Sequence, residues 1–264
     1  MERMHAVTRS TNRRHIRPHR SLRLVVVLLV LAVLATALVL LRPSAIDTLG
    51  TATGSLLSQP DCVVRTMDGK TGLDRAEAER ATTAAALQAR GVETPDTADL
   101  DEAVMQALAV GPSEGPGPVL TCRGGTADDL PEQALTDSGL TPRAEQVRTA
   151  MVEVFGEQSL GGFAPGGVGQ GHGEESTHYD GRAIDVFFRP ITEENQRGGW
   201  LLAQWLVAHA GSLDIQYVIF DDQFWSARIT RGQWHPYKAP APANEILRHL
   251  DHVHVDVLGK IPEA

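Results

Sequence analysis

Two short segments gather side chains that can bind a metal ion or transfer protons. The first, residues 176–185, reads Ser-Thr-His-Tyr-Asp-Gly-Arg-Ala-Ile-Asp, and the second, residues 251–256, reads Asp-His-Val-His-Val-Asp. Successive side chains of a β-strand point to opposite faces. If the second segment is a strand, its valines point into the core, and His252, His254 and Asp256 share the other face. Two imidazoles at positions i and i+2 can then serve one metal ion or one reaction centre.

The first segment supplies further polar groups that can reach the same place. Asp185 lies within the apolar run Ala-Ile-Asp-Val-Phe-Phe (183–188), so its side chain is expected on the face opposite the core. His178 precedes this strand in a loop, and Gly181 permits a tight return of the chain. Two histidines and one carboxylate leave the fourth position of a tetrahedral zinc ion open to water, which is typical of catalytic sites. His252 is then free to act as a general base.

The spacing S-x-H-x-x-G-x-A-x-D, followed far downstream by H-x-H, resembles the LAS metallopeptidases. This group includes lysostaphin, the D-Ala-D-Ala carboxypeptidases and the hedgehog signalling domain. The resemblance covers about residues 141–264. It implies that His178, Asp185 and His254 ligate zinc. It also implies that His252 is the general base, a role that other branches give to a glutamate.

Other positions in and around this pattern are also candidates for a role in the site. Ser176 matches a hydroxyl that the resemblance assigns to orienting a ligand or substrate. Carboxypeptidases of the group often place an arginine after Gly-(aromatic), where it stabilises charge on the attacked carbonyl; here the sequence has Ala164 in that position. Arg182 and the glycine-rich backbone of 166–173 are the candidates to replace it. Asp256 is either a solvated strand-end acid or a carboxylate behind the ligands.

Helices and strands alternate around these segments, which predicts an α+β domain over residues 141–264 with a mostly antiparallel sheet and flanking helices. Thr141 is a candidate N-cap with proline at the first helical position, and Gly156 ends that helix. A second helix is predicted over 199–210. The predicted strands are 183–188, 215–220 and 253–258.

The preceding part of the chain is predicted to form a small helical module, residues 61–125, with helices at 74–90 and 98–109. Linkers rich in Ser, Thr, Gly, Pro or Asp, residues 42–60 and 126–140, flank it. Cys62 and Cys122 bracket the module. They are predicted to form a disulfide that closes it and leaves the zinc domain independent; two unrelated buried thiols are the alternative. A spacer or protein-contact role is the expectation for this module.

The N-terminal region differs sharply from the rest of the chain. Residues 1–42 carry eight arginines and one acid and sum to +7, so a total of −9 leaves −16 for the remainder. Such an acidic part argues against binding of nucleic acid, which requires lysine and arginine. Residues 24–41 are apolar or small over 18 positions, long enough to span a bilayer. We therefore expect an arginine-rich cytoplasmic segment, 1–23, and an uncleaved anchor; a cleaved signal peptide is the alternative.

Together these features predict a single-pass protein of the cell membrane with its C-terminal domain outside the cytoplasm. Its expected activity is that of a zinc peptidase on peptidoglycan peptides, with zinc-activated water and His252 as base. The alternative, motivated by Ala164, is a catalytically weak or inactive metal-containing module that binds the cell wall or another protein.

Overall fold

The structure is a computed structural model and describes residues 59–124, 129–173, 175–229 and 232–259. Within these ranges no helix is both long and apolar enough to cross a membrane. The predicted anchor at 24–41 and the arginine-rich segment lie outside the described residues, as does most of the linker at 42–60. Pro60–Ala264 group as one compact unit.

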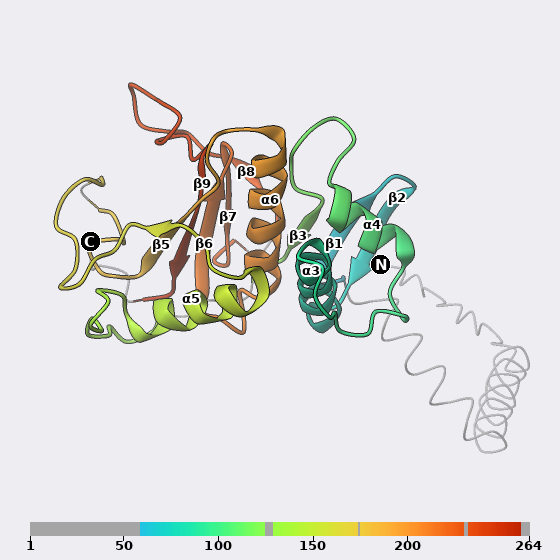
Figure 1. The fold of residues 1–264 in the computed structure, drawn as a ribbon, viewed down its shortest axis with the longest axis horizontal. Coiled ribbons are helices and arrows are strands. Elements are labelled where there is room, and N and C mark those ends of the chain that lie inside the picture. Colours follow the sequence, from blue (N-terminus) through green and yellow to red (C-terminus); the bar gives the residue numbers. More distant parts are fainter. Residues whose placement is uncertain (1–58, 125–128, 174, 230–231, 260–264) are drawn as a thin grey trace, which may run out of the picture. The chain divides into compact units, whose positions relative to one another are not determined.

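The C-terminal part is built on an antiparallel sheet of six strands in the order β4-β5-β9-β6-β7-β8 (Figure 1). The strands are β4 (Leu160–Gly161), β5 (Ala183–Phe187), β6 (Ile215–Phe220), β7 (Gln223–Ser226), β8 (His235–Pro236) and β9 (His252–Val257). The α+β class and the antiparallel sheet are therefore confirmed. The short strands β4, β7 and β8 were not predicted.

Two helices accompany this sheet. Helix α5 (Pro142–Phe155) has the predicted bounds, because the Thr141 hydroxyl accepts a hydrogen bond from the backbone N–H of Ala144 and Gly156 ends the helix with a φ of +75°. Helix α6 (Glu193–Ala208) begins earlier than predicted. A Cβ at Gly199 would lie 2.3 Å from the Phe220 ring, so this glycine lets α6 approach β6 closely.

The module at 61–125 is not purely helical, which corrects the sequence prediction. Helices α3 (Arg75–Ala89) and α4 (Glu102–Val110) are accompanied by a sheet of three strands, β2-β1-β3. Its strands are β1 (Cys62–Thr66), β2 (Gly69–Leu73) and β3 (Leu120–Cys122). Cys62 and Cys122 lie opposite each other in the β1–β3 pair and form the predicted disulfide, with their Cα atoms 3.9 Å apart.

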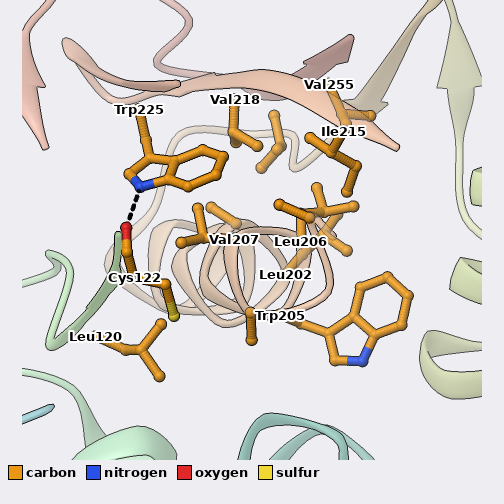
Figure 2. Close-up of a cluster of buried hydrophobic side chains, with 14 of the residues drawn as sticks. Leu120, Cys122, Leu202, Trp205, Leu206, Val207, Ile215, Val218, Trp225 and Val255 are labelled. Atoms are coloured by element: carbon orange, nitrogen blue, oxygen red, sulfur yellow. Dashed lines mark hydrogen bonds between the residues drawn. The ribbon is translucent and has the colours of Figure 1, made fainter. Parts of the chain in front are cut away.

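This module shares its core with the large sheet. Helix α6 packs on the sheet with one side and on α3 and β3 with the other. Figure 2 shows the apolar residues of α6 between strands of the large sheet and Leu120 and Cys122 of β3. The indole N–H of Trp225 donates to the Cys122 carbonyl at 2.8 Å. The independence of the two parts, expected from the sequence, is thus at odds with a common hydrophobic core.

Buried Gln204 of α6 strengthens this connection. Its side-chain oxygen accepts hydrogen bonds from the backbone N–H groups of Val119, at 2.7 Å, and Leu120, at 2.6 Å. The described part of the predicted linker, 129–140, is mostly exposed or half-buried and ends at the fully buried Leu140. Buried backbone groups need partners, and the Gln204 side chain supplies them, so it ties β3 to α6.

Candidate metal centre

Three histidine rings from two places in the chain, the turn before β5 and strand β9, meet at one carboxylate oxygen, Oδ1 of Asp185. His254 Nδ1 lies 3.1 Å from it, His178 Nε2 3.3 Å, and His252 Nε2 3.7 Å. All four side chains are buried. Burial by itself would raise the pKa of Asp185, but hydrogen bonds and charge interactions with His178 and His254 outweigh it and hold that pKa well below its usual range. The carboxylate is therefore the negative centre of this cluster.

The pairing of β5 with β9 brings Asp185 and His254 together. Asp185 of β5 is directly opposite His254 of β9, and Phe187 is opposite His252. Directly opposed side chains of an antiparallel pair lie on the same face of the sheet. The valines of β9 are buried and alternate with these residues, and Figure 2 shows Val255 among the residues packed around α6. The polar face predicted from the sequence is the face away from α6.

A tight turn brings His178 to the same place. Backbone hydrogen bonds from Gly181 to His178 and from Arg182 to Thr177 close the turn. Gly181 has a φ of +64°, and a Cβ there would lie 2.5 Å from the Gly139 carbonyl oxygen, so both its conformation and its surroundings require glycine. On the other side, a Cβ at Gly162 would lie 2.2 Å from Cε1 of His178. The backbone of 162 thus packs directly on the histidine ring.

Part of the predicted donor set has the spacing of metal ligands. Ligand atoms about 2.0–2.1 Å from a tetrahedral zinc lie roughly 3.3 Å apart, and Asp185 Oδ1 lies 3.3 Å from His178 Nε2 and 3.1 Å from His254 Nδ1. The remaining ring nitrogens, His178 Nδ1 and His254 Nε2, are buried without a hydrogen-bond partner. Among the described residues, the donor atoms of His172, His178 and Asp185 all lie within 4.8 Å of one another and could hold a metal ion. This group includes two of the predicted ligands and His172, which was not predicted, but not His254.

His252 is oriented by a residue that the sequence analysis did not single out. Its Nδ1 lies 2.8 Å from Oδ1 of Asp251, and the other oxygen of that carboxylate accepts a bond from Arg189 Nε at 2.6 Å. Arg189 in turn lies over the Phe187 ring. Burial opposes ionisation of Asp251, yet the bonds from His252 and Arg189 lower its pKa. A carboxylate on Nδ1 favours the tautomer whose Nε2 is a proton acceptor.

The other predicted site residues lie farther from the cluster. Ser176 accepts a long bond, 3.4 Å, from the backbone N–H of His178. Arg182 is paired with buried Asp256 at 3.1 Å and also donates to the Val257 carbonyl at 2.9 Å. Burial raises the pKa of Asp256, and Arg182 opposes this rise. Asp256 is therefore not a solvated acid, and the Arg182 guanidinium is already engaged.

Two histidines missing from the predicted site pack against it. His172 stacks on His178 with ring centroids 4.0 Å apart. His249 lies with its ring 4.7 Å from that of His252 and 5.6 Å from that of His254. His249 has a φ of +55°, a strained backbone of the kind that collects at functional sites. Neither residue belongs to the recognised spacing, so the sequence carried no signal for them beyond residue type.

The fold and this cluster define an α+β protein with a buried His/Asp centre that could hold a metal ion. The family described as VldE, C-terminal domain, matches residues 136–245. The chain is similar to this family over a stretch that includes His178 and Asp185 and ends before His252 and His254. No curated protein and no solved structure matches the chain.

Proposed function

We propose that this protein is a zinc peptidase that cleaves short peptides of peptidoglycan outside the cytoplasm. The observation that carries the proposal is the convergence of His178, His252 and His254 on Asp185. His178, Asp185 and His254 would hold the ion, and zinc bound by two imidazoles and a carboxylate acidifies water and polarises a carbonyl. The resemblance of the spacing to the LAS metallopeptidases favours peptide hydrolysis over other reactions of such a centre.

His252 is the residue we assign to proton transfer. With Nδ1 bonded to Asp251, its Nε2 faces the centre and can accept a proton from water as the water oxygen adds to the scissile carbonyl carbon. The same Nε2 then protonates the departing amine as the C–N bond breaks. Asp251 stabilises the imidazolium between these two steps, and Arg189 holds the Asp251 carboxylate in place.

The disulfide and the N-terminal sequence support a location of the domain outside the cytoplasm, where peptidoglycan lies. The Cys62–Cys122 disulfide is of a kind that persists in oxidising, extracytoplasmic compartments. The sequence of residues 24–41 supports anchoring in the cell membrane, with the arginine-rich N-terminus inside. Peptidoglycan stem peptides are the peptides that such an outward-facing domain would meet.

The test uses the full-length protein purified in detergent with zinc. It is incubated with muropeptides of several stem types, and released D-alanine or shortened stems are sought by mass spectrometry. Cleavage that disappears in His252→Ala, with zinc content unchanged, would support the proposal. Zinc-loaded protein that cleaves none of the stems would contradict it.

One observation favours the second candidate, a metal-containing module that binds wall or protein without turnover. Ala164 replaces the arginine of related carboxypeptidases, and Arg182 is occupied by Asp256. By analogy with the removal of an oxyanion-hole donor, loss of such a preorganised charge costs about 2.7–4 kcal/mol of transition-state stabilisation. Binding to cell-wall sacculi that survives in His252→Ala, in protein that releases no product, would identify this alternative.

A further inference from the structure

The position of His172 is set by an unusual pair of hydrogen bonds to its backbone. The Tyr179 hydroxyl donates to the His172 carbonyl at 2.7 Å and accepts from the His172 backbone N–H at 3.0 Å. Tyr179 follows His178 directly in the sequence, so one turn places both the His178 ring and the clamp that holds His172. The two histidine rings are consequently stacked, with an interplanar angle of 28°.

This placement brings a further donor to the metal centre. Donor atoms of His172, His178 and Asp185 all lie within 4.8 Å of one another. His172 is half-buried, and its ring lies against the buried ring of His178.

The segment that carries His172 is otherwise loosely packed. A Cβ added at Gly166, Gly169, Gly171 or Gly173 would meet no heavy atom within 4 Å among the described residues. Gly166 and Gly171 have φ values of +82° and +97°, which only glycine adopts without strain. The two hydrogen bonds of the Tyr179 hydroxyl therefore hold His172 within a segment whose glycines have open space beside them.

We propose that His172 is a displaceable fourth protein ligand, which closes the metal centre at rest and leaves when a peptide substrate binds. The proposal rests on the metal centre described under the proposed function. Four protein ligands are typical of closed structural zinc sites, whereas a catalytic site keeps one position open. His172 on a glycine-rich segment would supply both states, with Tyr179 as the positioning residue that favours the closed one.

The experiment measures metal binding by the full-length protein in detergent and does not depend on peptidase activity. Zinc affinity is determined by competition with a chromophoric chelator, and cobalt(II) replaces zinc for absorption spectra. We expect His172→Ala to weaken zinc binding by at least about tenfold, the scale on which loss of a residue that supports a metal site acts. Its cobalt spectrum should change as an imidazole is lost. Tyr179→Phe, which keeps the ring and removes the clamp, should shift both readouts the same way by less.

His249→Ala is the matched control, because His249 also packs on rings of this cluster but, unlike His172, is not grouped with His178 and Asp185. Equal losses of affinity in His172→Ala and His249→Ala would overturn the proposal, since removal of any packed ring would then suffice. Unchanged affinity and spectrum in His172→Ala would also overturn it. Wild-type protein that binds neither metal would remove the proposed function as well. Absent peptidase activity in metal-loaded protein would remove only the proposed function.

Discussion

Oδ1 of Asp185 lies 3.1 Å from Nδ1 of His254 because the two residues are directly opposite each other in the β5–β9 pair. They are 69 residues apart in the chain. The same oxygen also faces His178 and His252, so one buried carboxylate oxygen lies within 3.7 Å of three imidazole rings. The stability and the metal binding of the site should both depend on it.

The first prediction concerns that carboxylate. Asp185→Asn keeps the shape of the side chain but removes its charge, so we expect zinc bound per chain to fall to near zero, measured by elemental analysis after dialysis. Asp180→Asn is the control, because Asp180 is an exposed acid on the adjacent turn and pairs with Arg182. Retention of zinc by Asp185→Asn would show that the ion binds elsewhere.

A second prediction tests the contact between Gly162 and His178. Both Gly162 and Gly166 have positive φ values, +81° and +82°, so alanine strains either backbone equally. Only at 162 would the new Cβ collide with the His178 ring, at 2.2 Å. We expect Gly162→Ala to lower the free energy of unfolding by about 1–3 kcal/mol more than Gly166→Ala, as overpacking does, and to weaken zinc binding. Urea denaturation and chelator competition of the two variants measure this difference.

Proton transfer by His252 gives a third prediction. If the protein is a peptidase, His252→Ala should reduce turnover by about 10²–10⁴-fold, the usual contribution of general acid–base catalysis, with zinc content unchanged. Asp251→Asn should give a smaller loss of kcat with little change in KM, because it weakens the orientation and basicity of His252 without touching substrate. A change confined to KM in Asp251→Asn would contradict the role given to Asp251.

The shared core leads to a fourth prediction, on cooperativity. A disulfide that closes a loop of about 60 residues contributes roughly 4 kcal/mol in the chain-entropy model. Because Trp225 and Gln204 tie β3 to the large sheet and α6, reduction should destabilise residues 60–264 as one unit. Tryptophan fluorescence and zinc release should then follow one urea transition at a lower midpoint. Reductant should not affect the Cys62→Ala/Cys122→Ala variant, and two separate transitions would indicate independent domains.

The fifth prediction is a pH dependence due to His249. Burial, together with the charges of His254 and His252, lowers the pKa of His249 from 6.5 to about 3. Between these values the unfolded chain binds a proton that the folded protein does not, so stability declines as pH falls from about 6.5 toward 3. The slope from one such group is at most about 1.4 kcal/mol per pH unit. His249→Gln should flatten it in metal-free protein, measured by urea denaturation at pH 6.5 and 4.5; an unchanged slope would assign the effect to other groups.

Features set by local sequence were predictable. The cap at Thr141 and the stop at Gly156 defined α5 as predicted, because caps act within one turn of the helix. The predicted helix at 74–90 likewise agrees with α3, which Asp74 caps. Strand β6 has the predicted bounds, since a run of β-branched and aromatic residues specifies it. Strand β2, Gly-Lys-Thr-Gly-Leu, was missed because glycine and lysine have low strand propensity and its pairing with β1 decides its conformation.

The sequence by itself determined which residues share a face, because the alternation of valine with His252, His254 and Asp256 follows from strand geometry alone. Only the tertiary structure decided which of them meet at Asp185 Oδ1, because register and turn placement depend on contacts between distant segments. Asp256, on the same face, is paired with Arg182 instead, while His172 reaches the centre through the Tyr179 hydroxyl. Such long-range placements depend on how side chains pack, and spacing along the chain does not encode them.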